Sequence, residues 1–222
     1  MRRKSRLAAC SPALLLAISA LLLFPESASA QHAYYIDCAG GSDNNPGTKT
    51  SPWQHAPGMP GFSHKGYSHS AGDQVIFQGG VTCPVSYFPW TISNSGMSGT
   101  PDYYGVDKTW FTRGAWTRPV FDGGKTGPSG NWVTINGNNV TLDNIEMKNQ
   151  GVPAGRQYKA IDMEGKNDVV TNFYIHAHYL IGTCSTGDDT ANGFFGITLG
   201  GSKPQRKSDA WDQLRQQRRS YG

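Results

Sequence analysis

The chain has 222 residues and a formal net charge of +4 at pH 7, from 20 basic and 16 acidic residues. The positive charge lies at the two ends: residues 1–30 contribute +3 (four basic, one acidic), residues 202–222 contribute +4 (six basic, two acidic), and residues 31–201 carry −3 (10 basic, 13 acidic). Because a nucleic-acid-binding groove needs clustered basic residues, the acidic central part excludes nucleic acid as an expected partner.

Residues 1–30 have the three parts of a secretory signal peptide. Basic residues at positions 2–6 are followed by an apolar run of eleven residues (14–24), and residues 28–30, Ala-Ser-Ala, match a cleavage site. The apolar run is shorter than the ~20 residues that a membrane-spanning helix needs. We therefore expect a secreted, periplasmic or cell-surface protein with no stable membrane anchor after cleavage. The alternative is an uncleaved anchor.

Three cysteines follow the expected cleavage site: Cys38, Cys83 and Cys184. In an oxidising compartment one pair is expected to form a disulfide, and Cys38 with Cys83 is the favoured pair. The alternative is three buried thiols, since free cysteine behaves as a small apolar residue. The sequence contains no C-x-x-C motif, so the spacing gives no indication of a zinc site.

The central part of the sequence predicts short strands separated by turns. Glycine (28 residues) and proline (13 residues) are abundant, and no long apolar pattern with helical spacing occurs before residue 202. Runs rich in β-branched and aromatic residues, which are typical of strands, occur at residues 74–77, 119–121, 132–135 and 140–142. An all-β fold is therefore expected, and a helical bundle is excluded.

Two neighbouring segments repeat each other without a gap. When residues 132–149 are placed over residues 160–177, at an offset of 28 residues, apolar positions meet apolar positions. The matched pairs are Val133 with Ile161, Ile135 with Met163, Leu142 with Val170, Ile145 with Phe173 and Met147 with Ile175. Residues 196–201 repeat residues 160–165 at an offset of 36. Such in-phase repetition is typical of solenoids, whose stacked coils share one core.

The repeat predicts an incomplete right-handed parallel β-helix, with a β-sandwich as the alternative. Neighbouring coils lie ~4.8 Å apart, so Asn144 and Asn172 are expected to form a side-chain ladder. We expect an N-terminal cap with irregular first coils (31–130), regular coils (131–201) and a basic tail (202–222). Within the tail, residues 208–219 have the pattern of a short helix. This helix either plugs the open coil or belongs to a truncated or frame-shifted copy of a longer β-helix, which is the favoured interpretation.

Residues 34–53, YYIDCAGGSDNNPGTKTSPW, resemble the opening segment of secreted parallel β-helix proteins of the pectate-lyase-like superfamily. Residues 71–80 and 94–100 are similar to the next landmarks of that family. The resemblance extends over about residues 34–200. It implies a β-helix protein that acts on plant or microbial polysaccharide as a lyase or glycoside hydrolase. No motif matches the family's catalytic residues, so no catalytic role is carried over. The sequence establishes no cofactor with certainty; Ca²⁺ is the candidate, through Asp37 and Asp43.

Two outward faces of the predicted coils carry groups suited to chemistry. Alternation turns Asp162 and Glu164 outward on one face. Such paired carboxylates either hold Ca²⁺ against an acidic sugar or act as acid and base on a glycosidic bond. The second face is expected to carry Glu146, Lys148, Tyr174, His176 and His178, of which Lys148 and His176 are suited to proton transfer. For both faces the alternative is a solvated polar surface.

Aromatic residues supply the expected substrate-binding groups. Trp90, Trp110, Trp116 and Tyr174 are predicted to stack on sugar rings, with packing in the core or cap as the alternative. Together these features predict a secreted polysaccharide lyase or glycoside hydrolase. The alternatives are a non-catalytic glycan-binding, adhesin-type surface protein and a fragment without activity. The sequence leaves the substrate and the oligomeric state open.

Overall fold

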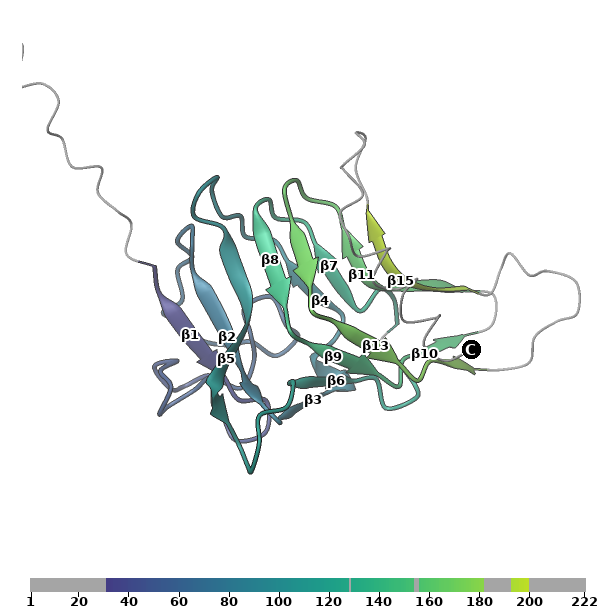
Figure 1. Cartoon of the computed structure of the whole chain (residues 1–222), viewed down its shortest axis with the longest axis horizontal. Helices are drawn as coiled ribbons and strands as arrows, with labels where there is room; N and C mark the ends of the chain where they lie inside the picture. The colour runs from purple at the N-terminus through teal and green to yellow at the C-terminus, as the bar shows by residue number, and fades with distance from the viewer. Residues whose placement is uncertain (1–30, 128, 154–155, 182–192, 200–222) are drawn as a thin grey trace, which may run out of the picture. The chain divides into compact units, whose positions relative to one another are not determined.

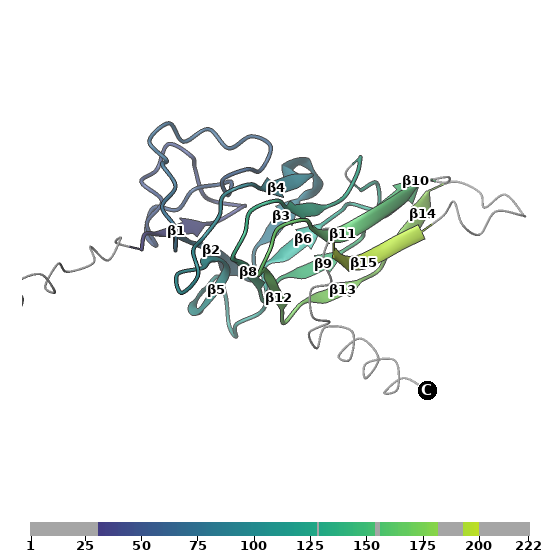
Figure 2. The same ribbon diagram turned by 90° about the horizontal axis from the view of Figure 1, so that it is seen from above.

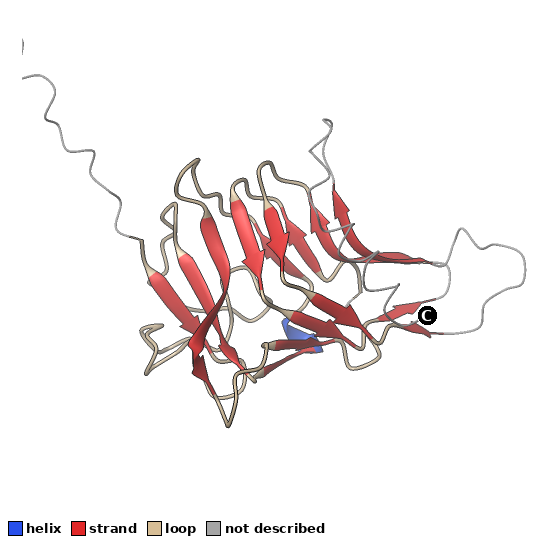
Figure 3. Ribbon diagram, viewed as in Figure 1, coloured by secondary structure: helices blue, strands red, loops and turns tan. Residues whose placement is uncertain are grey.

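The computed structural model describes residues 31–127, 129–153, 156–181 and 193–199. The expected signal peptide (1–30), the loop that contains Cys184 (182–192) and the expected tail (202–222) lie outside the described residues. Within the described ranges the chain forms fifteen β-strands and a single short 3-10 helix, η2 (Val85–Tyr87) (Figure 3).

The strands form three long sheets and one short sheet (Figure 1). The first sheet contains β1 (Ala33–Ile36), β2 (Gln74–Gly79), β5 (Asp102–Phe111), β8 (Val140–Asp143) and β12 (Val169–Thr171). The second sheet contains β3 (Thr82–Pro84), β6 (Val120–Asp122), β9 (Glu146–Lys148) and β13 (Tyr174–His176). The third sheet contains β4 (Trp90–Ile92), β7 (Val133–Ile135), β11 (Gln157–Met163) and β15 (Gly193–Leu199). The short sheet pairs β10 (Gly151–Pro153) with β14 (Tyr179–Ile181).

Each turn of the chain adds one strand to each long sheet, and this defines four coils: β2-β3-β4, β5-β6-β7, β8-β9-β10-β11 and β12-β13-β14-β15. All pairs between named strands are parallel. Figure 2, seen from above, shows the same succession of coils. The fold is the predicted right-handed parallel β-helix, and the parallel pairing excludes the β-sandwich alternative.

The register of the strands confirms the repeat predicted from the sequence. Val133 lies opposite Ile161, and Ile135 lies opposite Met163. Leu142 lies opposite Val170, and Met147 lies opposite Ile175, at the same offset of 28 residues. The next step, at an offset of 36 residues, places Ile197 opposite Ile161 and Leu199 opposite Met163. Because these side chains point inward, each coil buries the apolar face of its neighbour.

Five of the six equivalent corner positions in the third and fourth coils are asparagines in the left-handed conformation, and the sixth is Ala177. In the third coil the φ angles are 54° at Asn139, 59° at Asn144 and 61° at Asn149. The corner positions 28 residues later also have positive φ: 59° at Asn167, 54° at Asn172 and 53° at Ala177. Asparagine is one of the few residues other than glycine that adopt this conformation readily. The turn chemistry therefore repeats together with the core.

The expected ladder between Asn144 and Asn172 takes a different form. Both amides donate to the carboxylate of Asp143, from Asn144 Nδ2 at 2.8 Å and from Asn172 Nδ2 at 2.7 Å. The direct amide-to-amide contact lies one corner earlier, where Asn167 Nδ2 donates to Asn139 Oδ1 at 3.3 Å. A carboxylate accepts stronger hydrogen bonds than an amide oxygen, so Asp143 takes both donors.

Residues 37–73 form the N-terminal cap, which closes the outer edge of β1. Tyr35 N–H donates to Gly47 O, Trp53 N–H donates to Tyr35 O, and Asp37 N–H donates to Trp53 O, each at 2.9 Å. The indole ring of Trp53 stacks on Tyr34 with ring centroids 4.6 Å apart. The cap therefore satisfies backbone groups that would otherwise form an unpaired sheet edge.

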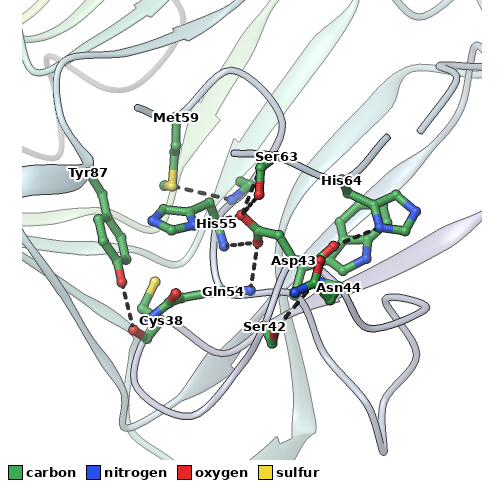
Figure 4. A network of polar contacts seen from close by, with 12 residues as sticks. Cys38, Ser42, Asp43, Asn44, Gln54, His55, Met59, Ser63, His64 and Tyr87 are labelled. Carbon is green, nitrogen blue, oxygen red and sulfur yellow. Dashed lines mark hydrogen bonds and ion pairs between the residues drawn. The ribbon is translucent and has the colours of Figure 1, made fainter. Parts of the chain in front are cut away.

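The cap is organised around the buried carboxylate of Asp43 (Figure 4). Asp43 Oδ1 accepts the backbone N–H groups of Gln54 and His55, and Asp43 Oδ2 contacts His55 Nδ1 at 2.9 Å and accepts Ser63 N–H. Despite the opposing effect of burial, hydrogen bonds from His55 and Gln54 and the nearby His55 ring lower the pKa of Asp43. Asp43 thus links the backbone of residues 54, 55 and 63 within the cap.

Covalent and polar links join the cap to the first coils. Cys38 in the cap forms a disulfide with Cys83 in β3, which is the pair that the sequence favours. Trp90 Nε1 donates to Pro57 O at 2.9 Å, and His69 Nε2 lies 2.7 Å from Asp102 Oδ2 in β5. These contacts hold the cap against coils one and two.

The left-handed corners make a testable distinction between two substitutions of Asn144. Asn144→Val is expected to lower the free energy of unfolding by about 2 kcal/mol, because a β-branched residue is strained at positive φ and the bond to Asp143 is lost. Asn144→Gly relieves the strain and is expected to cost about 1 kcal/mol or less. Urea denaturation of both variants measures the difference, and equal losses would contradict the role of the backbone conformation.

A second prediction concerns Asp168, whose Oδ1 accepts Val140 N–H from the preceding coil at 2.9 Å, while its Oδ2 is buried without a partner. Burial raises the pKa of Asp168 to about 6. The folded state therefore favours the protonated carboxyl, and stability falls as the pH rises from about 4 to about 6. Asp168→Asn keeps the accepting oxygen and is expected to raise the free energy of unfolding at pH 7.5 by about 1 kcal/mol, allowing for solvent screening.

The same substitution is expected to have a much smaller effect at pH 3.5, where the carboxyl is protonated in the folded chain and mostly protonated in the unfolded chain. Urea denaturation of the parent chain and of Asp168→Asn at both pH values tests this. A stability difference that is the same at pH 3.5 and 7.5 would show that charge is not its cause.

Candidate functional site

Asp162 faces outward from β11, as predicted, but its carboxylate is enclosed by neighbouring side chains. Lys159 Nζ donates to both carboxylate oxygens at 2.7 Å, Asn131 Nδ2 donates to Oδ2 at 2.8 Å, and Thr198 Oγ1 donates to Oδ1 at 2.8 Å. The Asp162 side chain is 6% exposed. Its charge is therefore neutralised by contacts that join three successive coils.

Glu164 follows the end of β11 and is exposed. It thus lies in solvent, whereas Asp162 is buried in its own network. This corrects the expectation that Asp162 and Glu164 form one accessible carboxylate pair.

Two of the three tryptophans predicted to bind substrate are packed in the fold. The side chain of Trp90 is fully buried, with its ring 5.7 Å from Phe77, and Trp110 is buried with its ring 5.0 Å from Tyr35. Trp116 is partly buried, and Lys108 Nζ lies 5.1 Å from its ring centroid. The packing alternative is therefore correct for Trp90 and Trp110, which are not available to stack on a sugar.

The outer face of the second sheet gathers the remaining predicted groups. In the register of β6, β9 and β13, Glu146 lies beside Val120 and Tyr174, while Lys148 lies beside Asp122 and His176. The alternate residues Phe121 and Met147 are fully buried in the core. Strand alternation therefore points Asp122, Glu146, Lys148, Tyr174 and His176 outward together. We call these five residues the acid–base face.

The central contact of the acid–base face joins two coils. His176 Nε2 lies 3.0 Å from Glu146 Oε1, and the side chains of His176 and Glu146 are 32% and 24% exposed. The ring of Tyr174 stacks on the imidazole of His176 with centroids 4.3 Å apart. This places an exposed aromatic ring next to a solvent-accessible pair of proton-transfer groups.

Asp122 and Lys148 extend the acid–base face by a loose ion pair, with Lys148 Nζ 4.0 Å from Asp122 Oδ2. Asp122 Oδ1 accepts two shorter hydrogen bonds, from Asn149 Nδ2 and Gly124 N–H, each at 2.9 Å. The Asp122 carboxylate is thus held by neutral donors. The long contact from Lys148 to Asp122 leaves the ammonium group able to face an anionic ligand as well.

His178, which the sequence placed on this face, lies deeper in the fold. Burial, and secondarily the positive charge of His176, lowers the pKa of His178 to about 4. His178 is therefore uncharged at neutral pH. Both ring nitrogens of His178 are buried, whereas the His176 side chain is 32% exposed.

The acid–base face combines the elements of proton-transfer chemistry on a sugar. A partly exposed imidazole held by a carboxylate is a suitable general base or acid. A lysine ammonium can neutralise a substrate carboxylate, and a tyrosine ring presents an apolar surface of the kind that stacks on sugars. Asp122 is the one member that the sequence analysis missed, because the step from Asp122 to Lys148 does not follow the 28-residue repeat.

The two carboxylates considered for calcium are engaged in local backbone contacts. Asp37 Oδ1 accepts Ala39 N–H at 2.9 Å and Gly40 N–H at 3.0 Å, and Asp43 is bound as described for the cap. Across the part of the chain that the structure describes, no group of three or more His, Cys, Asp or Glu side chains is arranged to hold a metal ion. In the same part, no helix has the length and apolar character needed to cross a membrane.

No protein-family model matches the sequence, and no curated protein matches it. Among solved structures, the chain is similar to a rhamnogalacturonan lyase, with a TM-score of 0.50 and 22% sequence identity over 68% of this chain and 37% of that one. It is also similar to a GH136 lacto-N-biosidase from Eubacterium ramulus, in a selenomethionine derivative (TM-score 0.44, 17% identity, 77% of this chain and 31% of that one) and in the native protein (0.43, 14%, 76% and 40%).

These likenesses concern the fold alone. The chain spans 37% of the length of the rhamnogalacturonan lyase. The two proteins share an arrangement of coils. The candidate site of this chain is therefore described from its own residues.

Proposed function

We propose that this chain is an exported protein that binds an acidic polysaccharide on the acid–base face and cleaves it by elimination. The observation that carries this proposal is the contact between His176 and Glu146, at 3.0 Å, beside Lys148 and under the ring of Tyr174. The lyase-type β-helix that the structure resembles is consistent with this proposal at the level of the fold. Export follows from the signal-like residues 1–30.

Elimination suits the charges on the acid–base face better than hydrolysis does. Hydrolysis uses two carboxyl groups that flank the scissile bond. On this face Asp122 is held by Asn149 and Gly124, and Glu146 is held by His176, so the face does not offer two unengaged carboxylates to flank a scissile bond. Elimination instead needs a base for the proton next to a uronate carboxylate and a cation to stabilise the negative charge that develops there.

The residues of the face have distinct roles in the proposed reaction. Glu146 accepts the hydrogen bond from His176 Nε2–H, which leaves the lone pair on Nδ1 to act as the base. His176 removes the proton at the carbon next to the substrate carboxylate, and Lys148 pairs with that carboxylate. The C–O bond at the neighbouring position breaks as a carbon–carbon double bond forms, and the departing oxygen takes a proton from solvent.

Activity on a panel of pectic, alginate and neutral glycans, with and without calcium, tests this reaction through the ultraviolet absorbance of the unsaturated product. His176→Ala and Glu146→Gln are each expected to lower kcat by about 10²-fold or more, because each removes part of the proton-transfer pair. Glu164→Gln is the matched control: it removes an exposed carboxylate outside the acid–base face and is expected to leave kcat unchanged. Absence of unsaturated product from every acidic glycan, with a folded chain, would reject elimination.

Glycan binding without turnover is a second candidate function, favoured by the exposed ring of Tyr174, since stacking on a sugar needs no proton transfer. Tyr174 is 39% exposed and Tyr179, on β14, is 38% exposed. Tyr174→Ala is expected to weaken glycan binding about tenfold, from the loss of a stacking contact of about 1 kcal/mol or slightly more, while Tyr179→Ala leaves it unchanged.

Calorimetry with the tightest-binding glycan from an array measures both tyrosine variants. Binding that survives His176→Ala and Glu146→Gln while no product forms would assign the chain as a binding module. If Tyr174→Ala and Tyr179→Ala weaken glycan binding equally, the acid–base face is not the binding surface.

A further inference from the structure

The five residues of the acid–base face carry less positive charge than an acidic ligand requires. Asp122 and Glu146 contribute two carboxylates, and Lys148 contributes one permanent positive charge. With a neutral His176, one positive and two negative charges sum to −1. A site with this sum repels a polyanion. Binding of an acidic glycan, on which the proposed function depends, therefore requires a further cation beside the face.

Arg118 lies at the border of the face, at the corner between the first and the second sheet. It precedes Pro119, whose carbonyl oxygen accepts the N–H of Glu146 at 3.0 Å. Its side chain extends from the second coil to the fourth, where its Nε donates to the carbonyl oxygen of Asn172 at 3.1 Å. Asn172 is two residues before Tyr174, the register partner of Glu146. The guanidinium is therefore held beside the row formed by Glu146 and Tyr174.

The contact with Asn172 leaves the charge of Arg118 available to a ligand. Arg118 is partly buried, and among the described residues no carboxylate lies within ion-pair distance of its guanidinium. The bond to Asn172 uses Nε–H, so the N–H groups of the terminal nitrogens are the donors that can meet an anion. The planar guanidinium binds a carboxylate through parallel N–H donors, a geometry that an ammonium group does not offer.

We propose that Arg118 forms a second anionic subsite of the acid–base face, so that the ligand is an acidic glycan with carboxylates on at least two of its sugars. This inference rests on the proposed function and narrows its substrate. Lys148 lies beside His176 in the register, and Asn172 precedes His176 by four residues. The two cations are therefore separated by a distance on the order of 13 Å along the strand direction. A carboxylate on a single sugar cannot reach both.

The two cations also set the direction of the bound glycan. They follow one another along β9 and β13 rather than from coil to coil, so the glycan lies across the stack of coils. Glu146 and the ring of Tyr174 lie between them, where the ring can contact a sugar that links the two charged ones. The charge of Arg118 brings the sum on the face from −1 to zero, which removes the repulsion of an acidic ligand.

Arg118→Gln tests the subsite in the full chain, with oligogalacturonates and oligomannuronates from disaccharide to hexasaccharide as probes. Glutamine keeps an N–H donor but removes the charge. For the hexasaccharide that is cleaved, KM is expected to rise about tenfold while kcat changes by less than about twofold, because Arg118 binds the glycan away from the reacting atoms. For the shortest oligosaccharide that is cleaved, KM is expected to stay unchanged. Arg118→Lys is expected to recover part of the loss, because it keeps the charge without the planar guanidinium.

Lys125→Gln is the matched control. Lys125 follows β6 in the same coil as Arg118, and its Nζ lies 5.4 Å from the ring centroid of Tyr179, on the short sheet. The substitution changes the net charge of the chain by the same amount outside the acid–base face, so KM is expected to stay unchanged at every length. Circular dichroism verifies that each variant is folded. An equal rise of KM in Arg118→Gln and Lys125→Gln would overturn the inference, because net charge would then explain it.

The dependence on glycan length separates this inference from the proposed function. If Arg118→Gln raises KM equally for the shortest and the longest oligosaccharide, or not at all, the parent chain still cleaves and the second subsite alone is rejected. If oligosaccharides bind without forming product, the dissociation constants from calorimetry take the place of KM, with the same expected changes. A parent chain that neither cleaves nor binds any acidic glycan would overturn both the proposed function and the subsite.

Discussion

In-register stacking of equivalent side chains on parallel strands is the constraint on which the structure depends. A single coil has an apolar inner face that it cannot bury alone, so Ile135 needs Met163 beside it and Met163 needs Leu199. A shift of one residue would turn every inward side chain outward. The left-handed asparagines at the corners keep the number of residues per coil constant where the offset is 28, and so they protect this register.

The same constraint builds the acid–base face. Once Phe121 and Met147 point into the core, their neighbours in β6 and β9 have to point out. Residues from three coils then meet, although Asp122 and His176 are far apart in sequence. Packing, rather than local loop structure, thus positions the proton-transfer pair: β9, which carries Glu146, is paired on both sides, and β13, which carries His176, is paired with β9. The Tyr174 ring lies on β13, the last described strand of this sheet.

The sequence predicts the fold well where it repeats and less well where it does not. The pairs Val133–Ile161 and Met147–Ile175 are predicted by the apolar periodicity of the sequence. This periodicity arises because equivalent positions of stacked coils are buried in the same core. The burial of Asp162 does not follow from the alternation of side chains along β11. It depends on contacts with Lys159, Asn131 and Thr198, which come from three different coils. The alternation of residues along a strand predicts which side chains point away from the core. It does not predict whether such a side chain is accessible to solvent.

The closed edge of β1 also determines how copies of this molecule are able to meet. Head-to-tail stacking would need an unpaired edge at both ends, and it would generate open-ended filaments. With Gly47 and Trp53 bonded along β1, the first sheet offers no such edge at that end. In the first sheet of the described residues, the unpaired edge is then that of β12, and two copies that meet there form an isologous contact that closes on itself.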